Sequence, residues 1–318
     1  MRKILLIKTS SLGDIIHALP VVTDLAMHFP DAKIDWVVEE NFVDIPALHP
    51  AVRRVIPVAI RRWRKNILRK NTWHEIEAFK KNLRMEIYDA VLDTQGLIKS
   101  ALITRWASGK KYGYDFFSAR EPLASLVYDK KYHVEKALHA VERNRALSSQ
   151  VFEYNKLFSL SYGIEAAASK ADWLPQTNYA VLLHATSRAD KEWPEAHWIA
   201  LGKKMRARDI FSVLPWGSET EKNRAQRLVA AIPNAVLAPR LSIKQAAGLL
   251  AGAEAIVGVD TGLTHLAAAL NKPVVAIFCA SSPGLTGMYG NPRAVNLGEA
   301  GRAPSVDEVW ASMQPALK

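Results

Sequence analysis

Short apolar runs alternate with amphipathic stretches along almost all of the 318 residues, and this alternation restricts the fold more than any other feature. The apolar runs have the length of buried strands, and the stretches between them carry apolar residues at helical spacing. Such a pattern is typical of strand–helix units that build a parallel sheet, so the sequence predicts an α/β protein. The predicted strands cover residues 3–8, 33–39, 52–59, 90–93, 179–184, 211–215, 235–238, 255–260 and 273–279. The predicted helices cover residues 15–29, 73–85, 99–107, 138–160, 195–207, 219–231, 243–251 and 263–270, with a last helix from 305.

The alternation stops once, near the middle of the chain. Residues 163–175 are small and polar, and the strands and helices start again at 179. We therefore place a domain boundary there, giving domains over 1–165 and 166–318. Each half has the pattern of one doubly wound, Rossmann-like domain, and we expect two such domains facing a cleft. Ligands of these folds bind beyond the carboxyl ends of the strands.

Composition excludes several classes of protein. Hydrophobic residues make up 49% and charged residues 23%, which is ordinary for a globular chain and excludes a disordered one. Cys279 is the only cysteine, so no internal disulfide can form, and a reducing compartment is favoured. No apolar run approaches the roughly 18 residues of a membrane span, and no signal peptide is apparent. We expect a soluble, cytoplasmic protein.

Positive charge is concentrated in one third of the chain. The formal net charge is +11, and residues 51–150, with 21 basic and 10 acidic side chains, account for all of it. Between Asp44 and Glu75 there are eight basic residues and no acidic one. Such an excess attracts a polyanion: nucleic acid, phospholipid head groups, or a phosphorylated or carboxylated substrate. A solvated surface is the alternative. The eight residues are Arg53, Arg54, Arg61, Arg62, Arg64, Lys65, Arg69 and Lys70.

A polar segment, Lys8-Thr9-Ser10-Ser11-Leu12-Gly13-Asp14, joins the first predicted strand to a helix. Hydroxyls and a glycine at such a junction expose backbone amides, and a helix N-terminus favours negative charge. Asp14 is therefore a candidate general base. Aspartate is also among the best residues for capping a helix, so a capping role stays open.

A second junction of this kind is Gly258-Val259-Asp260-Thr261-Gly262-Leu263-Thr264-His265. It offers free amides, two threonine hydroxyls and a histidine within one turn, which suits a diphosphate, although helix capping is again the alternative. Two further strand-end loops give weaker signals. Residues 184–194 offer hydroxyls and cations for phosphate oxygens. In residues 215–221, Glu221 can hold ribose hydroxyls or cap a helix.

Several kinds of site lack their residues. The first strand is not followed by G-x-G-x-x-G, and the chain contains neither G-x-x-x-x-G-K-[ST] nor G-x-S-x-G. The nine histidines show no zinc spacing, and Cys279 follows an apolar run that indicates packing. A nucleic-acid-binding protein is the rival from another functional class. It is disfavoured because no recognition motif accompanies the basic segment.

Taken together, these segments resemble glycosyltransferase family nine, the ADP-heptose-dependent heptosyltransferases, over essentially the whole chain. The segment from Lys8 to Asp14, followed by His17 and Pro20, is similar to that family's opening. Further similar segments are Ile60-Arg61-Arg62-Trp63-Arg64-Lys65, Arg120-Glu121-Pro122-Leu123-Ala124-Ser125-Leu126, Leu214-Pro215-Trp216-Gly217 and Val259-Asp260-Thr261-Gly262-Leu263-Thr264-His265. Leu12 stands where methionine is more usual, an apolar exchange. The resemblance implies the GT-B fold of two Rossmann-like domains.

The resemblance also implies a reaction. The donor would be ADP-L-glycero-D-manno-heptose, bound by the C-terminal domain, and the acceptor a Kdo sugar of Kdo-lipid A, bound by the N-terminal domain. Asp14 would deprotonate the acceptor hydroxyl, which attacks the anomeric carbon and inverts it. Lys191, with Thr186 and Ser187, would neutralise charge on the departing ADP, and Glu221 would hold the adenosine ribose. The sugar and diphosphate would be bound by Asp260, Thr261, Gly262, Leu263 and His265. The acceptor would be bound by Ser10, Ser11, Gly13, Arg61, Arg62, Arg64, Lys65 and Arg120.

The resemblance agrees with the residues, which show no metal-ligand cluster and no nucleic-acid recognition motif, so we expect no cofactor, no essential metal and no nucleic-acid partner. It places the protein peripherally on the cytoplasmic face of the inner membrane, in the assembly of the lipopolysaccharide inner core. A related transferase that adds a later core heptose is the nearest alternative.

Overall fold

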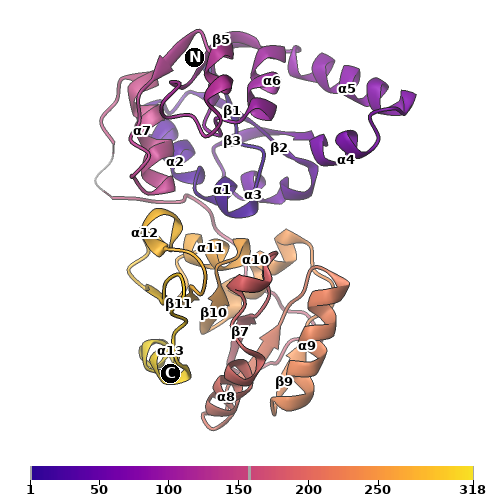
Figure 1. Ribbon diagram of the computed structural model, residues 1–318, viewed down its shortest axis with the longest axis vertical. Helices are drawn as coiled ribbons and strands as arrows, with labels where there is room; N and C mark the ends of the chain where they lie inside the picture. The colour runs from indigo at the N-terminus through magenta and orange to yellow at the C-terminus, as the bar shows by residue number, and fades with distance from the viewer. Residues whose placement is uncertain (1, 157–158, 318) are drawn as a thin grey trace. The chain divides into compact units, whose positions relative to one another are not determined.

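The computed structural model describes residues 2–156 and 159–317, and the chain divides into two compact units, residues 1–164 and 165–318 (Figure 1). Each unit contains one six-stranded sheet in which all neighbouring strands are parallel. The predicted fold class, α/β with two Rossmann-like domains, is therefore confirmed.

The first sheet has the strand order β3-β2-β1-β4-β5-β6, which is typical of dinucleotide-binding Rossmann domains. Successive strands are added on one side of β1 as far as β3, and from β4 onward on its other side. Ligands of such sheets bind beyond the carboxyl ends of the strands at this switch point, between β1 and β4. The strands are β1 (Lys3–Ile7), β2 (Lys33–Glu39), β3 (Val52–Val58), β4 (Ile87–Asp93), β5 (Ser108–Tyr114) and β6 (Lys130–Tyr132).

The helices of the first unit depart from the prediction in number and in bounds: the short helices over Asp44–Ala47 and Ile60–Lys65 were not predicted, and two predicted helices have other bounds. The helix predicted over 15–29 is two helices, and Pro20 lies in the first turn of the second, where proline is tolerated. The helix predicted over 138–160 ends at Phe152 because Glu153 adopts a left-handed backbone conformation, with φ of 58°. Residues 157–158 of that prediction lie outside the described residues. The helices are α1 (Leu12–Ile16), α2 (Leu19–His28), α3 (Asp44–Ala47), α4 (Ile60–Lys65), α5 (Lys70–Leu83), α6 (Ile98–Trp106) and α7 (Ala140–Phe152), with 3-10 turns η1 (Glu40–Phe42) and η2 (Pro122–Val127).

The second sheet has the order β12-β11-β10-β7-β8-β9, which is the same Rossmann order when counted from β7, with its switch point between β7 and β10. The strands are β7 (Tyr179–Leu183), β8 (Phe211–Leu214), β9 (Ala235–Leu237), β10 (Ala255–Val259), β11 (Val274–Ile277) and β12 (Ala294–Leu297). The helices are α8 (Glu195–Arg206), α9 (Glu219–Ala231), α10 (Ile243–Gly252), α11 (Gly262–Ala269), α12 (Pro283–Thr286) and α13 (Val306–Met313), with 3-10 turns η3 (Ala189–Lys191) and η4 (Gln314–Ala316).

The central strands form the cores. All residues of β7 and β10 are buried, and so are Ile4–Ile7 of β1. Strands covered by helices on both faces need apolar side chains at every position, which is why these segments are continuous apolar runs in the sequence. Trp36 of β2 is buried as well, and its Nε1 donates to the Lys8 carbonyl at 3.1 Å. None of the described helices is long and apolar enough to cross a membrane.

Three strands were not predicted: β5, β6 and β12. In β5, the glycines and lysines of Ser108–Tyr114 interrupt the apolar run. β6 and β12 are edge strands of three and four residues, and no residue of either is fully buried. Strands with so little buried surface leave no strong apolar pattern in the sequence.

Candidate active site

At each switch point, a polar loop singled out in the sequence lies beside the loop that follows the neighbouring strand. In the first unit, residues 8–11 follow β1, and residues 94–97 follow the neighbouring strand β4. In the second unit, residues 184–188 follow β7, and residues 260–261 follow the neighbouring strand β10. Because parallel strands end at the same edge of a sheet, each pair of loops forms one polar site.

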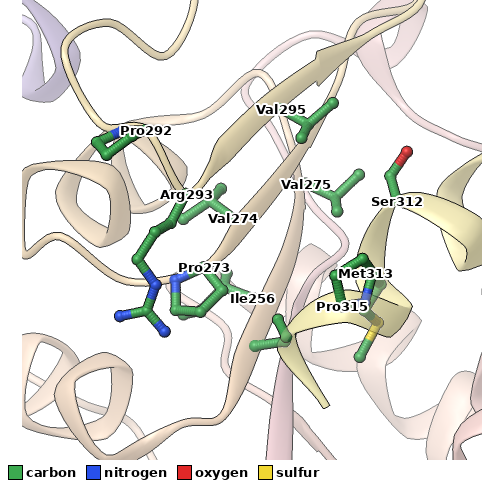
Figure 2. Close-up of a pocket in the computed structure, with 12 residues that line it drawn as sticks. Ile256, Pro273, Val274, Val275, Pro292, Arg293, Val295, Ser312, Met313 and Pro315 are labelled. Carbon is green, nitrogen blue, oxygen red and sulfur yellow. The ribbon is translucent and has the colours of Figure 1, made fainter.

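A further pocket, drawn in Figure 2, lies at the opposite edge of the second sheet. It has a volume of about 260 Å³ and is lined by the first residues of β10 and β11, by β12, and by the end of α13 with η4. Apart from Arg293 and Ser312 the side chains lining it are apolar. Arg293 and Ser312 are few polar groups beside the several hydroxyls and cations of the strand-end loops, so we place the candidate site at the carboxyl edges.

Asp14 occupies the third position of α1 and is half-buried. Its Oδ2 accepts hydrogen bonds from the backbone N of Ser11 at 2.8 Å and from Ser11 Oγ at 3.0 Å. Its Oδ1 has no hydrogen-bond partner in the part of the chain that the structure describes. The helix cap considered above is therefore formed, but it occupies only one carboxylate oxygen. The other oxygen is available to accept a proton.

Two side chains from the β4 side hold the loop after β1, and sequence reasoning missed both. Gln95 Oε1 accepts from the backbone N of Thr9 at 2.7 Å and from its Oγ1 at 2.9 Å, while Gln95 Nε2 donates to the Ser10 carbonyl. Lys99, near the start of α6, donates from Nζ to Ser10 Oγ at 2.7 Å. The sequence offered one signal for Gln95, its position: it lies two residues after Asp93, a charged residue at the end of a buried strand.

Two charged side chains are buried beneath the same loop. Lys8 Nζ donates to the Thr94 carbonyl at 2.8 Å. Burial lowers the pKa of the Lys8 amine, although the negative charges of Asp14 and Asp93 act in the opposite direction. Burial likewise raises the pKa of the Asp93 carboxyl, which accepts a hydrogen bond from the Tyr128 hydroxyl at 2.8 Å. The negative charge of Asp14 therefore lies near a buried cation.

The basic segment acquires counter-charges that its own sequence lacks. Arg53 pairs with Asp35 of β2 at 2.7 Å. Arg62 of α4 pairs with Glu40 at 3.0 Å and with Glu75 at 2.6 Å. These carboxylates lie outside the acid-free stretch or at its end, and sheet pairing and helix packing bring them close. The members of the segment that form ion pairs are Arg53, Arg54 and Arg62.

The other five basic residues of that segment are exposed and form no ion pair with any residue that the structure describes; they are Arg61, Arg64, Lys65, Arg69 and Lys70. Arg61 is linked to the loop after β1 through Glu39 and Lys99. Its backbone N donates to Glu39 Oε1 at 2.9 Å. Burial is the main cause that lowers the pKa of the Lys99 amine, and the positive charge of Arg61 lowers that pKa further. Of the predicted acceptor residues in α4, Arg62 is therefore the one already engaged by carboxylates.

Arg120 lies at the same edge of the first sheet. The preceding turn packs closely against Gly96, whose φ is +65°, and a Cβ on Gly96 would lie 3.3 Å from the Arg120 backbone N. The neighbouring Glu121 donates its backbone N to the Gly96 carbonyl at 2.9 Å. The structure thus brings Arg120 to the loops that hold Ser10, Ser11, Gly13 and Asp14.

Asp260, directly after β10, is the centre of the second site. Its Oδ2 accepts from Lys191 Nζ at 2.6 Å and from Ser281 Oγ at 2.8 Å, and its Oδ1 lies 3.4 Å from His265 Nε2. Burial acts to raise the pKa of the Asp260 carboxyl, but hydrogen bonds from His265, Lys191 and Ser281 outweigh burial and hold that pKa well below its usual range. Lys191 comes from the loop after β7, so the contact joins both loops of the switch point. Ser281 was missed from sequence.

The start of α11 supplies backbone amides to this site. Gly262 is the first residue of the helix, and the first amides of a helix have no intrahelical acceptor. Thr186 Oγ1 donates to the Asp260 carbonyl at 3.3 Å. Gly258 is required by close approach, because a Cβ there would lie 2.3 Å from Thr264 Oγ1. Thr261, Gly262 and Leu263 are half-buried at this turn.

A pocket of about 540 Å³ lies between the loop after β7 and the start of α9. This volume falls within the range of roughly 300–1,000 Å³ that is typical of small-molecule sites. Thr186, Ser187 and Glu221, all predicted donor residues, line it. Glu221 Oε2 accepts from the backbone N of Gly217 at 2.6 Å, so Glu221 caps α9 with one oxygen, as Asp14 caps α1.

Over residues 2–156 and 159–317, no group of three or more His, Cys, Asp or Glu side chains is arranged to hold a metal ion. Cys279 is half-buried beside the core of the second unit, and burial raises the pKa of its thiol. The packing role predicted for Cys279 agrees with that position.

Comparison with known proteins gives the family. The family model for glycosyltransferase family 9 (heptosyltransferase) matches residues 76–313. Lipopolysaccharide heptosyltransferase 1 of Pseudomonas aeruginosa is 50% identical over 301 residues, which cover 93% of this chain and 83% of the relative. The structure of E. coli heptosyltransferase WaaC with ADP superposes with a TM-score of 0.91 at 42% identity, covering 99% of each chain. The same E. coli protein with ADP-2-deoxy-2-fluoro heptose gives 0.88 at 41%, covering 98% of this chain and 99% of that one. From these similarities, the chain belongs to glycosyltransferase family 9, the heptosyltransferases.

Proposed function

We propose that this glycosyltransferase transfers L-glycero-D-manno-heptose from ADP-heptose to a Kdo sugar of Kdo-lipid A, in the inner core of lipopolysaccharide. The observation that carries the proposal is the cluster of Lys191, Asp260 and His265 at a switch point, beside a pocket of about 540 Å³. The binding of ADP-2-deoxy-2-fluoro heptose by the E. coli relative supports the same donor here.

In this proposal the second unit binds the donor. The adenosine occupies the pocket lined by Thr186, Ser187 and Glu221, and the free carboxylate oxygen of Glu221 holds the ribose hydroxyls. The diphosphate lies on the amides at the start of α11, where a helix N-terminus favours an anion. Asp260 is an anion itself, so we assign it the task of holding Lys191 and His265 toward the donor.

The first unit binds the acceptor and supplies the base. Asp14 Oδ1 takes the proton of the acceptor hydroxyl as its oxygen forms a bond to the anomeric carbon. The bond from that carbon to the diphosphate oxygen breaks, and ADP departs with the electron pair from the opposite face, which inverts the configuration. Lys191 and the α11 amides stabilise the charge on the departing diphosphate. Because a diphosphate leaves as an anion, no general acid is needed.

We further propose that the reaction needs no metal ion, since a lysine and helix amides serve the diphosphate. After treatment with EDTA the enzyme should keep most of its turnover. Complete loss of activity that a single divalent ion restores would contradict this.

We also propose that the protein works at the cytoplasmic face of the inner membrane, because the acceptor is a membrane lipid. The unpaired basic residues of the first unit, which include Arg64, Lys65 and Arg120, suit an acceptor that carries phosphates and Kdo carboxylates.

The deciding experiment offers the purified protein ADP-heptose with two acceptors, Kdo-lipid A and the same lipid already carrying one heptose. Mass spectrometry should show one added heptose on Kdo-lipid A alone. Transfer only to the heptosylated acceptor would assign the protein to a later step of core assembly. Tight donor binding without transfer to either lipid would reject the proposed acceptor.

A further inference from the structure

The connection between α4 and α5 presents apolar side chains to solvent. Leu68 is 96% exposed, the largest value among the exposed large apolar residues of the described chain, and its neighbour Ile67 is 45% exposed. Trp73, in the first turn of α5, is 52% exposed. Single exposed apolar residues are ordinary, but adjacent ones that form a patch mark an interaction site. We call Ile67 and Leu68 the apolar tip.

Hydrogen bonds from α5 hold the apolar tip in one conformation. Thr72 Oγ1 donates to the Asn66 carbonyl at 2.8 Å, and Trp73 Nε1 donates to the Ile67 carbonyl at 2.9 Å. The backbone N of Arg69 also donates to the Asn66 carbonyl, at 3.0 Å. The fold therefore fixes this turn with its aliphatic side chains in solvent, although burying them would be favourable.

Uncompensated positive charge surrounds the apolar tip on both sides. Arg64 and Lys65 precede it, Arg69 and Lys70 follow it, and all four are exposed. None of the four forms an ion pair with a described residue, whereas the nearby Arg62 pairs with two carboxylates. Basic side chains beside exposed aliphatic residues and a tryptophan are typical of segments that lie in a membrane interface.

We propose that this turn docks onto an anionic lipid bilayer. The apolar tip enters the boundary between head groups and acyl chains, Trp73 lies at the level of the head groups, and the four flanking basic side chains contact lipid phosphates. The proposal rests on the proposed function in one respect, namely that the acceptor is a membrane lipid. Nucleic acid would use the basic residues but leave the apolar tip without a role, and this favours the bilayer.

The test measures binding to vesicles of phosphatidylethanolamine and phosphatidylglycerol that contain no acceptor. The full-length double variant Ile67→Ser/Leu68→Ser is compared with Met85→Ser. Met85 is 72% exposed and follows the opposite end of α5, a helix of 14 residues and thus about 21 Å long. Both variants remove exposed apolar side chains without changing charge, two at the apolar tip and one at Met85, so the comparison tests whether the position of the apolar surface matters.

Wild-type protein and Met85→Ser should sediment equally with these vesicles, and less with vesicles of phosphatidylcholine alone. Removing the apolar tip should weaken partitioning by about tenfold or more, the effect expected for burying one or two aliphatic side chains. Replacing Arg69 and Lys70 by Gln should weaken partitioning and reduce its dependence on salt.

Turnover on a deacylated, water-soluble Kdo acceptor separates this proposal from the proposed function. The tip variant should keep wild-type turnover there, and circular dichroism should show an unchanged fold. If neither the wild-type protein nor any variant transfers heptose to any acceptor, while vesicle binding follows the pattern above, only the proposed function fails. Equal vesicle binding by the tip variant and wild type would overturn the docking proposal. So would a tip-dependent self-association, or a tip-dependent affinity for duplex DNA, without vesicle binding.

Discussion

Replacing Asp14 by Asn separates the two tasks that the structure gives this side chain. Asparagine keeps an oxygen that can accept from the backbone N and Oγ of Ser11, so the cap of α1 can persist. It cannot accept a proton as a carboxylate does. If Asp14 is the general base, Asp14→Asn should lower kcat by about 10²–10⁴-fold.

The expected change in stability is small by comparison. Asp14→Asn keeps the cap and loses the interaction of a negative charge with the helix N-terminus, worth about 0.3–1 kcal/mol, together with its attraction for the buried Lys8 amine. Asp14→Ala loses the cap as well, which costs about 0.5–2 kcal/mol. The two variants should therefore share the same loss of kcat and differ in the free energy of unfolding. Affinity for ADP-heptose should not change in either, because the residues proposed to bind the donor belong to the other unit.

Three measurements check this: turnover with saturating substrates, calorimetry with ADP-heptose, and urea unfolding. Near-wild-type kcat in a folded Asp14→Asn protein would refute the base and leave Asp14 as a cap alone. A kcat that follows stability, lower in the Ala variant than in the Asn variant, would instead show that the cap matters through the position of the loop.

Three further predictions concern charge. Lys191→Ala should lower kcat as well as donor affinity, because the amine is proposed to stabilise the charge that develops on ADP. Steady-state kinetics that show a raised donor KM with unchanged kcat would contradict this. Changing four basic residues of α4 to Gln should raise the acceptor KM and flatten its salt dependence while donor affinity stays the same, and an acceptor KM equal to wild type at low and high salt would show a merely solvated surface. The four are Arg61, Arg62, Arg64 and Lys65. Because the folded-state pKa of Asp260 lies below its unfolded value, its stabilising contribution is complete above about pH 4 and is lost as the pH falls toward the folded pKa. The difference in unfolding free energy between wild type and Asp260→Asn should therefore shrink on acidification from about pH 6 to about pH 3, and a constant difference in urea titrations would show that Asp260 does not stabilise the fold through its charge.

The sequence by itself determined the two Rossmann-like halves and the loops that carry chemistry. Strands such as β1 and β10 are buried on both faces, so their apolar runs are continuous and recognisable without neighbours. Asp14 lies at the start of the first helix after β1, and Asp260 directly follows β10. This local position is what made them candidates. Edge strands such as β6 were missed because partial exposure removes the apolar pattern.

Partners across space were decided only by the tertiary structure. Gln95 and Lys99 reach the loop after β1 because β4, distant in sequence, lies beside β1 in the sheet. Ser281 joins the second site for the same reason, since β11 lies beside β10. Side-chain type and local position are written in the sequence, whereas the strand order decides which loops share an edge.

The basic segment shows the same division. Composition correctly located an excess of positive charge, but it could not tell paired from unpaired cations. Arg62 pairs with Glu40 and Glu75 only in the folded protein, because these carboxylates belong to other elements of the chain. It also gave no sign that Leu68 would stay in solvent. Local sequence sets which groups a chain offers, and only the packed fold decides which of them are neutralised, buried or left free to bind, since each of these depends on distances between residues far apart in the chain.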